Sequence, residues 1–138
     1  NSRLLNTINE GEIIVAVSKN AQRNRIEKLE QLGCKIVQTE DINGRVDLHE
    51  LFRRLGEIEL TNILVEGGSR VITSVIEGRL ADRVMVFVAP IIIGGAGAKS
   101  PVLGTGINKI SEAAEIDEIE IKRFSNDIVI EGTLKYRG

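Results

Sequence analysis

The chain has 138 residues, of which 42% are apolar and 3% aromatic, so it can form one domain with an aliphatic core. Its 18 basic and 20 acidic residues nearly cancel, which gives no electrostatic case for binding nucleic acid or an anionic membrane. No apolar run approaches the roughly 20 residues of a membrane-spanning helix. The single cysteine, Cys34, excludes a disulfide within the chain and is typical of a protein of the reducing cytoplasm.

The first part of the chain is predicted to alternate strands with helices. Residues 12–17 contain a continuous apolar run, which is typical of a strand buried on both faces. A helix is expected next, with Asn20 as its N-cap and Gly33 as the glycine that follows its last turn. Residues 34–40 alternate around two apolar positions and predict a second strand.

A turn and a second helix are predicted to follow. Residues 41–46 contain an Asn-Gly pair, which favours a turn. Asp47 and Glu50 resemble a capping box in which Asp replaces Ser or Thr. Gly56 is expected to stop the helix, whose buried side is formed by Leu48, Leu51, Phe52 and Leu55.

The clearest functional signal is a predicted strand, turn and helix in the middle of the chain. Residues 63–65 predict a short buried strand, and Glu66 follows at its carboxyl end. Gly67 and Gly68 then form the turn into a helix that begins at Ser69 and ends near residue 78. Glycine lets the backbone approach a ligand closely, and a helix start presents free N–H groups and the positive end of the helix dipole.

We therefore expect this turn to bind phosphate, since ligands of open α/β sheets bind outside the carboxyl ends of strands. The alternative is a tight connection in which the glycines serve packing alone. The pattern matches neither G-x-G-x-x-G nor the P-loop. Glu66 could accept hydrogen bonds from a base, an amine or a sugar, or it could satisfy nearby backbone.

Three further side chains are candidates for ligand binding. Ser18 and Lys19 follow the first strand at the same predicted end of the sheet, where they could meet an adenosine 2′-phosphate or form an ordinary polar loop. Arg70 lies near the predicted phosphate site, although its default is an exposed helix position. His49 and Cys34 have no partners at metal-ligand spacing, so neither a metal site nor a catalytic triad is predicted.

The last part of the chain is predicted to contain three strands. Residues 83–90 form one, which Ile91–Ile93 could extend. Residues 94–106 form a glycine-rich loop that could serve as a lid or as a subunit contact, and residues 107–114 are irregular. The other two strands lie at 116–124 and 128–136, on either side of a Ser-Asn-Asp turn.

Together these elements predict a single α/β domain over residues 1–138. A mostly parallel central sheet is flanked by helices, and an antiparallel hairpin closes the chain.

Three spaced segments carry a family resemblance. They are Asn-Ile-Leu-Val-Glu-Gly-Gly-Ser at 62–69, Gly-Arg-Leu-Ala-Asp-Arg-Val at 78–84 and Val-Ala-Pro-Ile-Ile-Ile-Gly-Gly at 88–95. Together with Gly-Arg-Val-Asp-Leu at 44–48, they resemble the reductase domain of the bifunctional riboflavin-biosynthesis deaminase/reductase. The fold implied by this resemblance is dihydrofolate-reductase-like.

The resemblance implies that NADPH reduces a ribosylamino-pyrimidine phosphate and so opens the ribose to a ribityl chain. It implies that Glu66 contacts the substrate and that Ser18 meets the adenosine ribose or its 2′-phosphate. It also implies a Gly-Gly peptide that is often cis, and a homodimer for which residues 88–93 are a candidate contact. The catalytic residues stay unassigned. The cofactor pyrophosphate would be held by Gly67, Gly68, Ser69, Arg70, Val71 and Ile72.

The chain departs from the family pattern at its start. Family domains begin with a strand, a loop and a helix that bind substrate and nicotinamide, and no such segment precedes Asn1. We therefore expect the N-terminal strand to be missing and the chain alone to lack a complete hydride-transfer site.

Other functions remain open. One is a non-catalytic nucleotide-binding or dimerising module, and another is a relative that reduces a different pyrimidine or a pterin. An unrelated dinucleotide-fold enzyme is disfavoured, because no glycine fingerprint follows the first strand.

Overall fold

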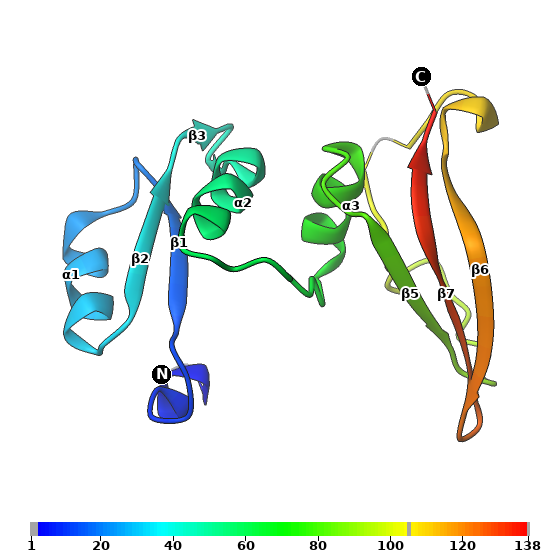
Figure 1. Cartoon of the computed structure of the whole chain (residues 1–138), viewed down its shortest axis with the longest axis horizontal. Helices are drawn as coiled ribbons and strands as arrows, with labels where there is room; N and C mark the ends of the chain where they lie inside the picture. Colours follow the sequence, from blue (N-terminus) through cyan, green and yellow to red (C-terminus); the bar gives the residue numbers. More distant parts are fainter. Residues whose placement is uncertain (1–2, 105, 138) are drawn as a thin grey trace. The chain divides into compact units, whose positions relative to one another are not determined.

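The computed structural model describes residues 3–104 and 106–137. The chain divides into two compact units, Asn1–Ile63 and Leu64–Gly138 (Figure 1). Three separate sheets are present in the described residues, two of two strands and one of three. The prediction of a single domain over residues 1–138 is not tested by this division and stays a prediction.

The first unit is built on a parallel strand pair. A 3-10 helix, η1 (Arg3–Thr7), precedes β1 (Ile14–Ser18), which pairs in parallel with β2 (Lys35–Thr39). Parallel strands need a crossover connection, and α1 (Arg23–Gln31) supplies it. Both predicted strands and the helix between them are therefore confirmed.

The end of α1 follows the prediction and its start does not. Gly33 has φ +87°, and the Cys34 amide donates to the Leu29 carbonyl at 3.0 Å, as in a Schellman motif. The N-cap is Gln22, which makes no side-chain capping bond, so the prediction of Asn20 is wrong. A turn directly follows β1 and contains Asn20, so the helix begins only after this turn.

A small hairpin follows β2. It consists of β3 (Asp41–Ile42) and β4 (Arg45–Val46), which pair antiparallel. The two residues between them, Asn43 and Gly44, both have positive φ, at 55° and 77°. Such a pair of angles is typical of a type I′ turn, which Asn-Gly sequences favour. The predicted turn is thus confirmed.

The second helix, α2 (Leu48–Glu57), begins at the predicted cap. Asp47 Oδ1 accepts hydrogen bonds from the amides of His49 at 2.9 Å and Glu50 at 3.2 Å. Gly56 does not stop the helix, which continues through Glu57. The reason is that glycine merely weakens a helix interior, by about 1 kcal/mol relative to Ala, and does not forbid it.

The second unit contains one helix and one antiparallel sheet. It contains α3 (Ser69–Glu77), β5 (Arg83–Val88), β6 (Ala114–Phe124) and β7 (Asp127–Tyr136). The middle strand, β7, pairs antiparallel with both β5 and β6. The predicted C-terminal hairpin is therefore confirmed. A short 3-10 helix, η2 (Ile110–Glu112), precedes β6.

A β-bulge interrupts the pairing of β6 with β7. The register shifts between Asp117 and Glu120, and Glu118 has φ +50°. Opposite the bulge is Gly132, where an added Cβ would lie 2.4 Å from Ile116 Cγ2 and 2.7 Å from Asp117 O. The bulge brings the neighbouring backbone so close that only glycine fits at this position.

The predicted strand at 63–65 is wrong. Residues 60–68 carry no regular structure, and the side chain of Leu64 is 80% exposed. A strand is held by hydrogen bonds to a neighbouring strand, and no described residue pairs with this stretch. The only parallel pairing in the described part of the chain is between β1 and β2, so the sheet is less parallel than expected.

The apolar run after β5 does not extend that strand. The strand ends at Val88, and Ile91–Ile93 lie exposed in the loop that follows. From residue 89 to 109 the described residues form neither helix nor strand, which confirms the predicted glycine-rich loop. None of the helices in the described ranges is both long and apolar enough to cross a membrane.

Candidate functional site

The turn before α3 has the backbone geometry of a ligand cradle. Gly67 has φ +123°, a conformation that side-chain-bearing residues rarely adopt, and the Gly67–Gly68 peptide is cis, as the resemblance implies. A Cβ added at Gly68 would meet no atom within 4 Å, so open space lies on that side of the turn. The turn therefore leaves room for a ligand beside its backbone.

The start of α3 is suited to an anion. Gly68 is its N-cap and offers no side chain to occupy the first amides. The amides of Val71 and Ile72 donate to the Gly68 carbonyl at 2.9 and 3.1 Å. Those of Ser69 and Arg70 have no carbonyl four residues earlier within the helix, and they form the positive end of its dipole.

The side chains around this helix start support the same conclusion. The first turn of α3 contains no acidic residue, and Arg70 is exposed there as a cation. Ser69 and Ile72 are half-buried, whereas Val71 is largely exposed. Glu66 is exposed just before the turn, where a ligand could reach its carboxylate. The helix start and the turn therefore gather the predicted residues 66–72 at one place.

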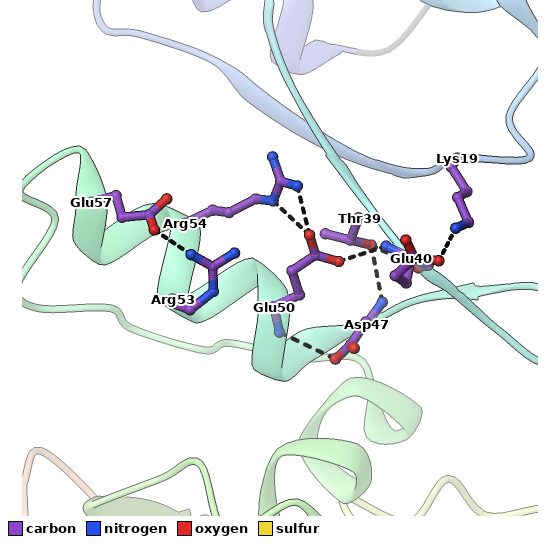
Figure 2. Close-up of polar contacts among 8 residues, drawn as sticks. All are labelled: Lys19, Thr39, Glu40, Asp47, Glu50, Arg53, Arg54 and Glu57. Carbon is purple, nitrogen blue, oxygen red and sulfur yellow. Dashed lines mark hydrogen bonds and ion pairs between the residues drawn. The ribbon is translucent and has the colours of Figure 1, made fainter.

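Ser18 lies in the other unit, at the end of β1, and it has an acidic neighbour. The Ser18 hydroxyl, followed by the Gly44 amide at 2.7 Å from Oδ1, holds the pKa of the Asp41 carboxyl below its ordinary value. Lys19 forms an ion pair with Glu40 (Figure 2). Two carboxylates thus lie beside the predicted 2′-phosphate loop, and their negative charge opposes the binding of a dianionic group there.

Sequence reasoning missed these two carboxylates. Asp41 and Glu40 directly follow an apolar strand, which is the same signal that drew attention to Glu66. Looking for a carboxylate directly after each predicted apolar strand would have identified both residues.

A polar network joins the end of β2 to the start of α2 (Figure 2). Glu50 Oε2 accepts from the Glu40 amide at 2.6 Å, and Glu50 Oε1 accepts from Arg54 Nη2 at 2.6 Å. These two donors, the Glu40 amide first, hold the pKa of the Glu50 carboxyl below its ordinary value. The Asp47 amide donates to Thr39 Oγ1 at 3.1 Å. The network is thus satisfied internally, and its role is to hold the helix against the strand.

The reciprocal hydrogen bond of the predicted capping box, from the Asp47 amide to the Glu50 side chain, is therefore replaced. Glu50 does not return to the Asp47 amide, because it reaches across to β2. Cys34 is a buried free thiol. Within the described residues, no three His, Cys, Asp or Glu side chains gather closely enough to hold a metal ion.

Comparison with known families and curated proteins gives consistent matches. A family model described as the RibD C-terminal domain matches residues 2–130. The chain is 33% identical over 130 residues to the riboflavin biosynthesis protein RibD of Actinobacillus pleuropneumoniae, covering 94% of this chain and 34% of that protein. It is 32% identical over 133 residues to the 2,5-diamino-6-ribosylamino-4(3H)-pyrimidinone 5′-phosphate reductase of Methanothermobacter thermautotrophicus, covering 96% and 59%. The chain thus spans only part of the length of both relatives.

Solved structures show the same fold. RibD of Acinetobacter baumannii (form 2) superposes with a TM-score of 0.69 at 15% identity, over 88% of this chain and 31% of that one. The riboflavin biosynthesis reductase Rib7 of Saccharomyces cerevisiae superposes with a TM-score of 0.66 at 15% identity, over 98% and 58%. The predicted α/β, dihydrofolate-reductase-like class is confirmed by these likenesses.

Proposed function

Because the chain belongs to the family of the RibD C-terminal domain, we propose that it is the dinucleotide-binding part of an NADPH-dependent reductase of riboflavin biosynthesis. The substrate would be a ribosylamino-pyrimidine phosphate of the 5-amino-6-(5-phosphoribosylamino)uracil type. Support comes from the Methanothermobacter relative, which is named a pyrimidinone 5′-phosphate reductase. Since the chain spans 34% and 59% of its two relatives, binding is proposed for this chain and the complete reaction for the whole protein.

The observation that carries the proposal is the backbone cradle at Gly67 and Gly68. Its positive φ, the open space beside it and a first helical turn without acidic residues fit a pyrophosphate. The contacts to this group are assigned to the backbone of the turn and to Ser69, Arg70, Val71 and Ile72. When bound, NADPH supplies the hydride that converts the ribosyl group to a ribityl chain.

Two further side chains are assigned contacts, one with the substrate and one with the adenosine part of the dinucleotide. Glu66, an exposed acceptor next to the cradle, would take hydrogen bonds from amino or hydroxyl groups of the substrate. Ser18 would contact the adenosine ribose. The carboxylates of Glu40 and Asp41 near Ser18 suit ribose hydroxyls, which donate hydrogen bonds, better than they suit a phosphate. The preference for NADPH over NADH is therefore tested by a separate measurement.

Calorimetric titration with NADPH and with NADH tests both parts. Tighter binding of NADPH supports the full proposal. Tighter binding of NADH would change the proposed cofactor to NADH and leave the proposed reductase activity in place. No binding of either would contradict the proposal and favour the second candidate, a non-catalytic dimerising module. Oxidation of the bound nucleotide on addition of the pyrimidine substrate, followed by loss of nicotinamide absorbance, tests the reaction itself.

We also propose that the chain pairs with a second copy through residues 88–93. The support is the apolar run that ends β5 and continues beyond it, where Ile92 is 101% exposed. Exposed apolar runs of this kind are typical of contact surfaces. Sedimentation of the wild type and of Ile92→Glu tests this: a dimer that the substitution dissociates supports the contact, and a wild-type monomer at high concentration contradicts it.

A further inference from the structure

The long glycine-rich loop is fastened to α3 by the side chain of one residue. Thr73 is only 6% exposed, although the loop it meets is exposed along residues 89–104. Its Oγ1 lies 2.7 Å from both the amide nitrogen and the carbonyl oxygen of Leu103, and 2.8 Å from the Ser69 carbonyl. The hydroxyl accepts from the Leu103 amide and has one proton to donate to either carbonyl. Thr73 thus ties the loop to the first turn of the helix.

The residue after Leu103 fits the same surface of α3. Gly104 has φ +114°, and a Cβ added there would lie 2.8 Å from Thr73 Cγ2 and 2.7 Å from Glu77 Oε1. The loop backbone therefore lies directly on the helix between two side chains one turn apart. We call Thr73, Leu103 and Gly104 the Thr73 clip. Figure 1 shows the yellow part of the loop beside α3.

The clip divides a connection that would otherwise be very long. Between the end of β5 at Val88 and the start of η2 at Ile110, the described residues contain neither helix nor strand. Structureless loops of this length are uncommon in compact domains and are usually functional or disordered. Fixing Leu103 removes much of the conformational freedom that the loop would have to lose if it contacted a ligand.

The clip acts on the helix that forms the proposed phosphate site. Ser69, whose carbonyl lies within reach of the Thr73 hydroxyl, is also the first residue of α3 and one of the proposed pyrophosphate contacts. A Ser or Thr hydroxyl that bonds the carbonyl four residues earlier often bends the helix at that point. The same oxygen atom of Thr73 therefore links the loop and the helix start.

We propose that Thr73 is a positioning residue, which fastens the glycine-rich loop to α3 so that loop and helix start are held together for the dinucleotide. This inference rests on the proposed function for its ligand. Thr73 does not touch the dinucleotide in this proposal; it lowers the entropy that the loop loses on binding.

Hydrogen exchange of the loop amides tests the clip without any ligand. Thr73→Val keeps the shape of the side chain and removes the hydroxyl, so the Leu103 amide should exchange about tenfold faster. Thr73→Ser retains the hydroxyl and should restore slow exchange. Thr133→Val removes a hydroxyl that bonds Glu118 on the hairpin, and it should leave the Leu103 amide unchanged. Unchanged exchange in Thr73→Val would overturn the clip.

A glycine pair provides a second test from the side of the loop. Gly104→Ala adds a Cβ where φ is +114° and Thr73 is close, so it should release Leu103 as Thr73→Val does. Gly97→Ala is the matched control in the same loop, because its Cβ meets no atom within 4 Å. Equal exchange at Leu103 in the two alanine variants would contradict the packing part of the clip.

Calorimetry with NADPH then tests positioning. Thr73→Val should raise the Kd roughly threefold to tenfold, with Thr73→Ser close to the wild type. Faster exchange with an unchanged Kd would overturn the positioning role and keep the clip as a purely structural contact. A wild type that binds neither NADPH nor NADH would overturn the proposed function and the positioning role together, while the exchange data would still decide on the clip.

Discussion

The carboxylate of Glu50 accepts a hydrogen bond from the backbone amide of Glu40, ten residues earlier, at 2.6 Å. It thereby joins the first turn of α2 to the end of β2 (Figure 2). The amide it satisfies follows the last residue of that strand, where no ladder partner is provided by β1. One side chain thus serves both as a helix residue and as the terminal bond of a strand.

Replacing this carboxylate should change how stability depends on pH. The pKa of Glu50 is lowered in the folded protein, so its stabilising effect is complete above the unfolded pKa and is lost as pH falls through the folded pKa. Glu50→Gln should therefore have a lower Tm than the wild type at neutral pH, and the difference should shrink in acid. Thermal unfolding followed by circular dichroism over this pH range measures it.

Glu57→Gln is the control for that experiment. Glu57 lies on the same helix and pairs with the exposed Arg53 one turn away, a contact that is expected to contribute little to stability. Its Tm should follow that of the wild type at every pH. If the two glutamine variants show the same pH dependence, the Glu50–Glu40 bond does not contribute as inferred.

Removing the α2 cap should weaken the fold by a known mechanism. Asp47 accepts from the amides of His49 and Glu50, and loss of such an N-cap costs about 1 kcal/mol. Asp47→Ala should lower the free energy of unfolding by that amount, whereas Asp47→Ser should lose much less because it can still cap. Urea denaturation measures both, and equal losses would show that capping is not the cause.

The two glycines of the cradle should respond differently to alanine. Gly67→Ala places a side chain at φ +123° and should cost roughly 1–3 kcal/mol of stability. Gly68→Ala has an ordinary φ of −73° and meets no protein atom, so stability should be kept. Its Cβ would occupy the space proposed for the pyrophosphate, so NADPH should bind more weakly. Wild-type affinity in Gly68→Ala would count against the cradle.

The glycine opposite the bulge should be the least replaceable in the sheet. In Gly132→Ala the new methyl group would lie 2.4 Å from Ile116 Cγ2 and 2.7 Å from a backbone oxygen, so roughly 1–3 kcal/mol should be lost to overpacking. Gly56→Ala, in the last turn of α2 with open space around it, should instead raise stability by up to about 0.5–1 kcal/mol. Denaturant unfolding of both variants tests these opposite signs.

Features set by neighbours in the chain were predicted well from sequence. The helix that begins at Ser69, the glycine at position 33 and the Asn-Gly turn all depend on the φ and ψ preferences of a few adjacent residues. The C-terminal hairpin belongs to the same group, since its strands are joined by a two-residue turn. The candidate residues 66–72 could be identified for this reason, because they are contiguous.

Features that need a distant partner were decided by the tertiary structure alone. The apolar run at 63–65 has the composition of a strand, but a strand exists only where another backbone pairs with it. Likewise, Glu50 had two possible amides to accept from, and the position of β2 selected Glu40. Thr73 and Leu103 are 30 residues apart, so no local sequence pattern predicts the hydrogen bond between them. Local preference determines which conformations a segment can adopt, and hydrogen-bond partners brought together by folding determine which of them it keeps.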